Sequence, residues 1–246
     1  MDNIRFQEIS DMIVNSIAQR EGIGTLSEKT LHAVLKNYYE ADAMKQEIKV
    51  GSKYADIFNE QGIIEIQTKQ FNKLRGKLDE FLPKYSVTIV YPIPYQKWLY
   101  WIDETTGQVS KGRRSPKKGN PYIAFAELYK IKQFLDHPNL HIRLVMLDIE
   151  EYRFLNGWSS NRKKGSSCSD RIPTRIEREI DIIDQKDYRF LIPEELPEEF
   201  TSKEFAKYAG IPVSLAQTGL NILYHIQVVD RIGKKGRLYL YQKRNT

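Results

Sequence analysis

The order of the periodic segments between residues 27 and 93 constrains the fold of this 246-residue chain more than any other feature of the sequence. Segments with apolar side chains at helical spacing alternate with short runs of β-branched and aromatic residues. In chain order they predict a helix over 27–40, strands over 48–50, 54–58 and 62–68, a helix over 71–82 that ends before Pro83, and a strand over 86–93. We therefore expect an α/β fold whose core runs helix, three strands, helix, strand.

The segments beyond residue 93 extend this domain and then change character. A second hairpin is expected from 98–103 and 108–110, followed by a helix near 122–135 and a strand over 141–149. Residues 157–178 are rich in Gly, Ser and basic residues without apolar periodicity, which predicts a long loop or linker. We place the domain boundary near residue 180, with one domain over 1–180 and a second over 181–246.

The C-terminal part of the chain has a separate pattern. Thr201 or Ser202, both N-cap residue types, precedes a short helix that ends at Gly210, and a second helix reaches about His225. Two short strands then flank the basic turn Gly-Lys-Lys-Gly at 233–236. This helix, turn, helix and basic hairpin resemble a winged helix-turn-helix domain, which implies a grip on double-stranded DNA.

Composition restricts the class of protein. Hydrophobic residues make up 41% of the chain and charged residues 28%, as in an ordinary soluble globular protein. No apolar run approaches the roughly 18 residues of a transmembrane helix, and the N-terminus lacks the apolar stretch of a secretory signal. We expect a cytoplasmic protein without a membrane partner. The single cysteine, Cys168, excludes an internal disulfide and a zinc site built on several thiolates.

Charge and missing motifs narrow the class further. Neither a P-loop nor a dinucleotide-binding glycine motif occurs, which argues against most ATPases and dehydrogenases. The chain has 38 Lys and Arg against 32 Asp and Glu, a net charge of +6, and a sequence pI near 9.1. This balance is a weak indication of a polyanionic partner.

Two carboxylates in the hairpin expected over 54–68 carry the most chemical information. If its turn is centred between Glu60 and Gln61, paired residue numbers sum to 121, so that Asp56 lies opposite Glu65. Two carboxylates this close repel each other, and a bound divalent cation reverses that cost. Carboxylate oxygens are the ligands that Mg²⁺ and Mn²⁺ prefer. The pair predicts either a metal site or an exposed hairpin face on which two acids happen to fall.

Glu28 is a candidate for a third metal ligand. Its direction lies about 20° from that of Leu35 around the first helix, which places it on the apolar side. Alternatively, Glu28 only favours the positive end of the helix dipole. The residues themselves leave both interpretations open.

The 25–93 segment resembles the core of the PD-(D/E)XK nuclease superfamily. The resemblance rests on an acidic residue in the first helix, then Asp56, then Glu65 and Gln67 two positions apart on the next strand, before a basic helix and a strand. It implies a restriction-endonuclease-like αβββαβ core in which Asp56 and Glu65 bind Mg²⁺ or Mn²⁺ and Glu28 assists.

Gln67 departs from the superfamily pattern, which has a lysine at this position. A glutamine amide can orient the attacking water but brings no positive charge. Lys69 or Lys53 is expected to supply that charge. The departure also allows the alternative of a nuclease fold that binds nucleic acid without cutting it.

Basic residues offer candidate phosphate contacts in two places. The segment 111–118, with Arg113 and Arg114, carries five positive charges in eight residues. The helix over 71–82 and the residues before it add further cations: Lys69, Lys73, Arg75 and Lys77. The alternative in both places is a solvated charged surface.

The second helix of the C-terminal segment separates into two faces. Polar side chains suited to reading base edges lie within about 60° of one direction: Ser214, Gln217, Thr218, Asn221 and His225. Lys234 and Lys235 at the tip of the hairpin are expected to contact phosphates only. A solvated helix face is the alternative.

Together these features predict a metal-dependent DNA endonuclease, with Asp56, Glu65, Gln67 and Lys69 as its catalytic residues. The alternative is a catalytically inactive nuclease fold that acts as a DNA-binding regulator. Cutting both strands of a duplex needs two active sites or sequential action, so a homodimer is one of the assemblies that we expect.

Overall fold

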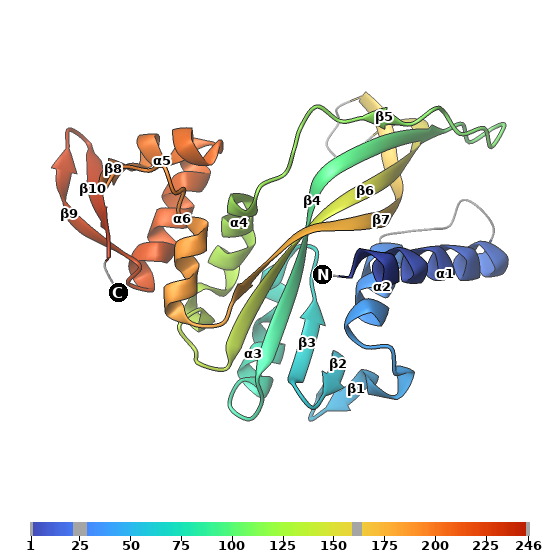
Figure 1. Cartoon of the computed structure of the whole chain (residues 1–246), viewed down its shortest axis with the longest axis horizontal. Helices are drawn as coiled ribbons and strands as arrows, with labels where there is room; N and C mark the ends of the chain where they lie inside the picture. The colour runs from blue at the N-terminus through green and yellow to red at the C-terminus, as the bar shows by residue number, and fades with distance from the viewer. Residues whose placement is uncertain (1, 22–28, 159–163, 245–246) are drawn as a thin grey trace. The chain divides into compact units, whose positions relative to one another are not determined.

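The computed structural model describes residues 2–21, 29–158 and 164–244 (Figure 1). The chain forms two compact units, each assembled from separate segments. Unit 1 contains Met1–Ile48, Pro92–Gly119 and Val145–Glu179, and unit 2 contains Lys49–Tyr91, Asn120–Leu144 and Ile180–Thr246. The division into 1–180 and 181–246 stays a prediction, although the residues after 180 all belong to unit 2.

Among the described residues, a seven-stranded sheet has the order β1-β2-β3-β4-β6-β7, with β5 paired to β4. Its strands are β1 (Gln46–Val50), β2 (Lys53–Asn59), β3 (Gly62–Ile66), β4 (Val87–Ile102), β5 (Arg113–Arg114), β6 (Leu140–Trp158) and β7 (Lys164–Ile182). β4, β6 and β7 each contribute residues to both units. The fold is therefore α/β, as the sequence predicts.

The helical segments before the C-terminal part are α1 (Asn3–Glu21), α2 (Lys29–Tyr39), η1 (Ala43–Lys45), η2 (Phe71–Leu74), α3 (Arg75–Phe81), η3 (Pro121–Ala124), α4 (Phe125–Leu128), η4 (Tyr129–Phe134) and η5 (Gln185–Leu191). Helix, three strands, helix and strand follow one another from α2 to β4 in the predicted order. The single helix expected near 122–135 is instead three short segments. None of the helices in the described ranges is long and apolar enough to cross a membrane.

The β2–β3 hairpin has the register that the sequence predicts. Ile57 pairs with Ile64 and Asn59 pairs with Gly62, so each pair of residue numbers sums to 121. Gly62 has a φ of +109°, and a Cβ atom there would lie 2.4 Å from the main-chain oxygen of Ser86. A side chain at this position would therefore strain the turn and push the next strand away.

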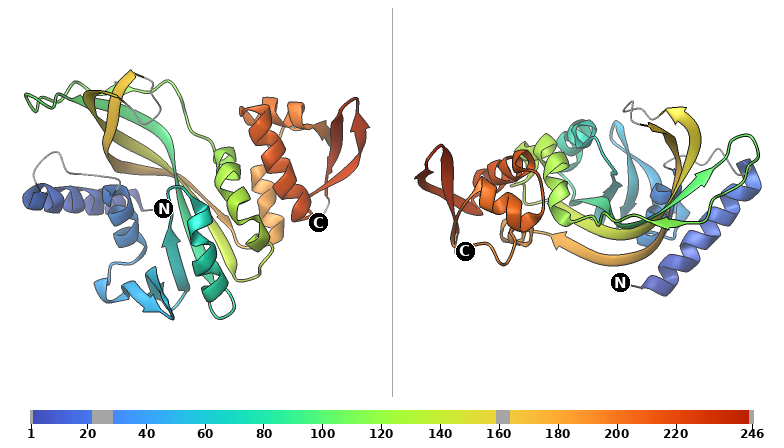
Figure 2. Two further views of the ribbon diagram at one scale, coloured as in Figure 1. Left: turned by 180° about the vertical axis from the view of Figure 1, so that it is seen from behind. Right: turned by 90° about the horizontal axis from the view of Figure 1, so that it is seen from above.

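Strand β3 is buried on both faces of the sheet. Ile63, Ile64, Glu65 and Ile66 are all buried, and β3 pairs in parallel with β4. Helix α3 runs alongside β3 and β4 (Figure 2) and buries apolar side chains such as Leu78. A charged side chain on β3 is therefore enclosed, and it needs a partner or a ligand.

The linker predicted over 157–178 is wrong for the residues that the structure describes, because 157–158 belong to β6 and 164–178 belong to β7, which pairs with β6. Residues 159–163 lie outside the described residues. Helix α1 holds the middle of β7. Ser10 Oγ donates to the Pro173 oxygen at 2.7 Å, and Asn3 exchanges two hydrogen bonds with the main chain of Ile176, at 3.1 and 2.8 Å. These polar contacts stabilise β7 in a stretch of sequence that lacks the alternating apolar side chains by which a strand is usually predicted.

The hairpin predicted from 98–103 and 108–110 is confirmed. Asp103 Oδ1 accepts the main-chain N–H groups of Thr105 and Thr106 at 2.8 and 2.9 Å, which closes the turn. The returning chain pairs with β4 at β5, with Arg114 opposite Trp98. The basic segment 111–118 is thereby fixed along the edge of β4.

The C-terminal part of unit 2 consists of β8 (Glu199–Thr201), α5 (Ser202–Ala209), α6 (Val213–His225), β9 (Val229–Lys235) and β10 (Leu238–Lys243). Thr201 caps α5 through a reciprocal pair of contacts with Glu204, and Gly210 ends the helix at a φ of +63°. The three strands form an antiparallel sheet in the order β8-β10-β9. α6 approaches α4 closely, since a Cβ atom at Gly219 would lie 2.5 Å from the ring of Phe125.

Candidate functional site

Asp56 and Glu65 lie next to each other on β2 and β3. The register of the hairpin, continued by one pair beyond Ile57 and Ile64, brings them together. Asp56 Oδ2 accepts the main-chain N–H of Ile66 at 2.8 Å, which fixes this carboxylate against β3. The predicted carboxylate pair is therefore present in unit 2.

Glu65 is enclosed and incompletely satisfied. Only 1% of the residue is exposed. Its Oε2 atom accepts from the Lys77 ammonium at 2.7 Å, whereas its Oε1 atom is buried without a hydrogen-bond partner among the described residues. The interpretation of the pair as an exposed hairpin face is therefore wrong, because one of the two acids is buried.

The surroundings of Glu65 disfavour its ionised form. Burial and, second, the Asp56 carboxylate raise the pKa of Glu65 from its ordinary value of 4.5 to about 7, although the Lys77 ammonium acts in the opposite direction. Glu65 thus has a second carboxylate beside it as well as the Lys77 ammonium, and its ionised form is disfavoured overall.

Lys77 was expected as a phosphate contact, but its ammonium instead contacts Glu65. Lys77 lies on α3, and only 27% of its side chain is exposed. The sequence contained one indication of this contact, because a basic helix directly follows the strand that carries Glu65. Arg75 on the same helix donates from Nε to the Lys130 main-chain oxygen at 2.7 Å.

The remaining predicted catalytic residues lie just beyond β3. Gln67 is half-buried, its main-chain N–H donates to the Val90 oxygen at 3.0 Å, and its side-chain Nε2 donates to the main-chain oxygen of Lys69. Lys69 itself is exposed. Glu28, the proposed third metal ligand, lies outside the described residues. Within the ranges that the structure describes, no group of three or more His, Cys, Asp or Glu side chains is arranged to hold a metal ion.

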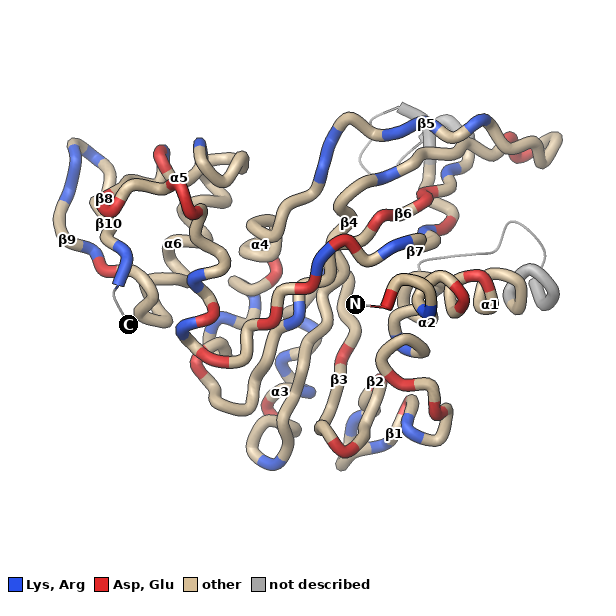
Figure 3. Tube along the Cα trace, viewed as in Figure 1, with Lys and Arg blue, Asp and Glu red and all other residues tan. Residues whose placement is uncertain are grey.

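The residues that the sequence predicts to contact DNA lie in both units, and Figure 3 shows the charged residues of each. In unit 1, Arg113 and Arg114 are exposed on β5. In unit 2, Lys234 lies over the ring of Tyr239 at 5.5 Å, and the Lys235 ammonium is 3.5 Å from a Glu204 oxygen. These side chains are placed for contact with solvent or with a ligand.

The polar stripe of α6 is only partly as expected. Ser214 and Gln217 are exposed, and Thr218 is half-buried with its hydroxyl donating to the Ser214 oxygen at 3.1 Å. The Asn221 side-chain oxygen accepts from the Lys132 ammonium at 3.0 Å. Asn221 therefore has a structural contact that the sequence did not reveal, whereas Gln217 remains the better candidate for a base contact.

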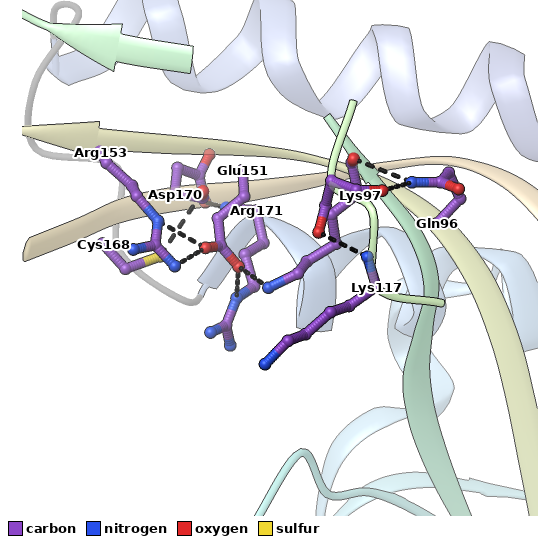
Figure 4. Close-up of polar contacts among 9 residues, drawn as sticks. Gln96, Lys97, Lys117, Glu151, Arg153, Cys168, Asp170 and Arg171 are labelled. Carbon is purple, nitrogen blue, oxygen red and sulfur yellow. Dashed lines mark hydrogen bonds and ion pairs between the residues drawn. The ribbon is translucent and has the colours of Figure 1, made fainter. Parts of the chain in front are cut away.

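A second charged centre, in unit 1, has no counterpart among the sequence-based predictions. Glu151 on β6 is fully buried and contacts Lys97, Arg153 and Arg171 (Figure 4). These residues come from three strands, β4, β6 and β7. From sequence spacing alone, only the contact between Glu151 and Arg153, two positions apart on one strand, could have been predicted.

Comparisons with known proteins assign no residue roles. Residues 29–183 match a family model described as a domain of unknown function, DUF8091. A protein of Treponema pallidum (strain Nichols), named only as an uncharacterized protein, is 26% identical over 228 residues, which cover 90% of this chain and 87% of that protein. No solved structure matches the chain.

Proposed function

The chain belongs to the DUF8091 family, whose matched region spans residues 29–183, so its activity has to be inferred from its own side chains; we propose that it is a metal-dependent DNA endonuclease that hydrolyses phosphodiester bonds. The observation that carries this proposal is the buried carboxylate of Glu65. It lies beside Asp56, and one of its oxygens has no hydrogen-bond partner among the described residues. A divalent cation bound here would engage that oxygen and offset the repulsion between the two carboxylates.

The donor set fits Mg²⁺ or Mn²⁺ chemically. Asp56 and Glu65 offer hard carboxylate oxygens, which Mg²⁺ and Mn²⁺ prefer to the softer thiolate and imidazole ligands that suit zinc. Two carboxylates with water completing the shell are a usual arrangement for Mg²⁺. When bound, the cation would lower the pKa of a water molecule and stabilise charge on the phosphate.

The protein side chains would then position the reactants. The amide oxygen of Gln67 can accept a hydrogen bond from the attacking water and orient it. The proposed positive charge is that of Lys77 in place of Lys69, because the Lys77 ammonium is the one in contact with Glu65. Lys77 would offset the negative charge that develops on the phosphate.

The order of elements supports the proposed nuclease core. α2, β1, β2, β3, α3 and β4 follow the αβββαβ order that the resemblance to the PD-(D/E)XK superfamily implies, and the carboxylates occupy the second and third strands. This support concerns fold and position. The chemistry rests on the carboxylate pair.

The C-terminal elements support double-stranded DNA as the substrate. A strand, two helices and a two-stranded hairpin with the sheet order β8-β10-β9 are the parts of a winged helix-turn-helix. Gln217 is exposed on α6, the helix that would enter the major groove, and Lys234 lies on the hairpin. These features favour duplex DNA over a small phosphate ester.

Plasmid cleavage tests the proposal. Purified protein is incubated with supercoiled plasmid and Mg²⁺ or Mn²⁺, with and without chelator. We expect cleavage that Asp56→Asn and Glu65→Gln each reduce by about a hundredfold or more, since even partners of metal ligands contribute about 10–100-fold. Glu60→Gln, at the exposed turn of the same hairpin, is the matched control and should cut like the wild type.

Two other outcomes have definite meanings. If Asp56→Asn cuts as fast as Glu60→Gln, the carboxylate pair is not the active site. If the wild type binds duplex DNA but never cuts it, the protein is the non-catalytic DNA-binding regulator that Gln67 already suggested. For Gln67, we expect Gln67→Lys to preserve or raise cleavage and Gln67→Leu to lower it.

A further inference from the structure

The guanidinium group of Arg231 on β9 lies among tyrosine rings. Its central carbon is 4.2 Å from the ring centre of Tyr224, 4.5 Å from that of Tyr239 and 5.7 Å from that of Tyr241. Tyr224 belongs to α6 and the other two tyrosines belong to β10, so three elements of unit 2 meet at this side chain. A cation over an aromatic face is attracted by the quadrupole of the ring. The rings therefore restrict the guanidinium group without supplying an oxygen to its N–H groups.

The N–H groups of Arg231 lack acceptors in the part of the chain that the structure describes. The Nε atom is buried without a hydrogen-bond partner, and within the described ranges no carboxylate forms an ion pair with this side chain. Asp230, the preceding residue, instead lies 3.6 Å from Arg244. Of the three guanidinium nitrogens only Nε is buried in this way, so the two terminal nitrogens reach solvent. Arg231 therefore carries a positive charge and free donors at an accessible edge.

A bulge in the hairpin places a second cation on the same face. Arg231 pairs with Tyr241 and Lys234 pairs with Tyr239, so Ile232 is an extra residue on β9. Residues opposite each other on neighbouring strands share a face, and so do two tyrosines that are two positions apart. Arg231 and Lys234 therefore lie on one face, although a regular strand would place residues three positions apart on opposite faces. The Lys234 ammonium is 5.5 Å from the ring centre of Tyr239.

The two cations and the rings around them are accessible. Arg231 is half-buried and Lys234 is exposed, and the exposed fractions of Tyr224 and Tyr239 are 42 and 47%. Tyr224 follows Gln217 by seven positions on α6, which is about 20° around the helix axis. Both residues thus belong to the exposed face of this helix. The cations of the hairpin adjoin the face of α6 that would contact base edges.

We propose that Arg231, positioned by Tyr224 and Tyr239 and accompanied by Lys234, binds phosphodiester groups of the DNA backbone. The terminal nitrogens of a guanidinium group match the two unbridged oxygens of a phosphodiester. Because the rings already restrict the side chain, less conformational freedom is lost when the phosphodiester binds. That the phosphodiester belongs to duplex DNA rests on the proposed function.

Duplex binding across a salt series, measured with full-length protein in the presence of chelator, tests this site. The chelator keeps the DNA uncut whether or not the protein is a nuclease. Arg231→Gln should reduce the slope of log affinity against log salt by about 0.9, which is about a tenfold loss at 0.1 M salt. The loss should be the same on different DNA sequences, since phosphates carry no sequence information. Arg231→Lys should keep the slope and lose only part of the affinity, because it keeps the charge but not the paired N–H groups.

The role of the rings is tested by substitutions that do not change the charge. Tyr224→Phe keeps the ring and should bind like the wild type. Tyr224→Leu should weaken binding about two- to fivefold, the scale of one partly exposed contact between a cation and a ring. Its salt slope should stay nearly unchanged, because Arg231 keeps its charge and loses only its support. Thermal unfolding identifies any loss of binding that comes from misfolding, and the Tyr224 variants test the site independently of a change at Arg231.

Arg244→Gln is the matched control for the loss of one positive charge. Arg244 also lies in unit 2, but its guanidinium group contacts Asp230 at 3.6 Å and the side-chain oxygen of Gln227 at 2.9 Å. Its substitution should leave the salt slope unchanged. An equal reduction in Arg231→Gln and Arg244→Gln would indicate a general charge effect and would overturn the inference.

Three further results would overturn it. Arg231→Gln could keep the slope of the wild type, Tyr224→Leu could bind like Tyr224→Phe, or the loss in Arg231→Gln could be confined to one DNA sequence, which would assign Arg231 to a base edge. Plasmid cleavage with Mg²⁺ judges the proposed endonuclease separately. If the wild type cuts while Arg231→Gln keeps its slope, only this site is wrong. If the wild type never cuts while Arg231→Gln loses slope, the site is supported in a non-catalytic DNA-binding protein.

Discussion

The two buried glutamates of this protein have opposite electrostatic surroundings. Glu65 in unit 2 contacts the Lys77 ammonium and lies beside a second carboxylate, one of its oxygens has no hydrogen-bond partner among the described residues, and its pKa is raised to about 7. Glu151 in unit 1 meets three cations with both oxygens engaged, and its pKa is lowered. Both are at most 1% exposed, so the number of neighbouring charges, and not burial, distinguishes them.

The comparison shows how neighbouring charges decide whether a buried acid is stable as an anion. Burial disfavours the charged form of both glutamates. The cations around Glu151 outweigh that cost, whereas the surroundings of Glu65 do not. The proposed divalent cation would act at Glu65, where the charged form is disfavoured.

The largest expected effect is the contrast between two equivalent substitutions. Glu151→Gln should lower the free energy of unfolding by about 3 kcal/mol, the lower end for breaking a buried ion pair, because its partly exposed cations keep some hydration. Glu65→Gln should raise the free energy of unfolding at pH 7 and above, by up to about 3 kcal/mol, since it removes a buried charge whose pKa is raised from 4.5 to about 7 and the repulsion from Asp56. Urea denaturation of both variants measures the contrast, and equal losses would break the comparison.

The next effect is the pH dependence of stability without metal. The folded pKa of Glu65 lies above its ordinary value of 4.5, so the folded state holds an extra proton between pH 4.5 and about 7. Stability attributable to Glu65 therefore falls as pH rises through this window, by about 3 kcal/mol at about 1.4 kcal/mol per pH unit. Above about pH 7 the loss is complete.

Glu65→Gln supplies the control for this pH prediction, because it should remove the falling component. Denaturation at intervals from pH 5 to 8 compares it with the wild type. If the stability of the variant and of the wild type fell in parallel with pH, the pH dependence would not come from Glu65. Glu151 has the opposite sign, since its pKa is lowered: its contribution is present above its ordinary pKa and is lost on acidification below it.

The stabilisation of the folded protein by a bound metal ion is expected to be slightly smaller than this pH effect. At Mn²⁺ concentrations about 100 times the dissociation constant, binding to the folded protein alone adds about 2.7 kcal/mol. Asp56→Asn should lose this stabilisation, and Glu151→Gln should keep it. Calorimetric melting of both variants with and without Mn²⁺ measures the stabilisation. If Mn²⁺ still raised the melting temperature of Asp56→Asn, the ion would bind at another site.

The smallest expected effect concerns α6, outside both centres. Gln217→Ala should weaken binding to a preferred DNA sequence by about 1–2 kcal/mol and binding to random DNA very little, because a base contact specifies sequence. Lys234→Ala should weaken both and reduce the salt slope by about one. Fluorescence anisotropy titrations measure the affinity of each variant for the two DNAs. If both variants lost the same affinity on both DNAs, α6 would not be the recognition helix.

Local patterns predicted much of the site around Glu65. Turn residues and strand alternation determine a hairpin register within a few residues, so the pairing of Asp56 with Glu65 followed from the sequence. Lys77 was assigned to the wrong partner because helical periodicity shows which face a residue shares but not which strand that face covers.

Long-range strand pairing accounts for what the sequence did not reveal. Glu151 meets Lys97 and Arg171 only because β4, β6 and β7 are neighbours, and these positions are 54 and 20 residues from it. β7 itself was taken for a linker, since its hydrogen bonds to β6 leave no periodic signal in a Gly- and Ser-rich stretch. Buried ion pairs built across strands are therefore the part of a site that a single sequence reveals least.

The interrupted course of the chain has a consequence for how this molecule denatures. The chain passes from one unit to the other after Ile48, Tyr91, Gly119, Leu144 and Glu179, and three strands belong to both units. Loss of either unit would release the strand ends that belong to the other. Heat or urea should accordingly melt the two units in one cooperative transition with coincident probes, and no single backbone cleavage before residue 180 should yield two fragments that each refold alone.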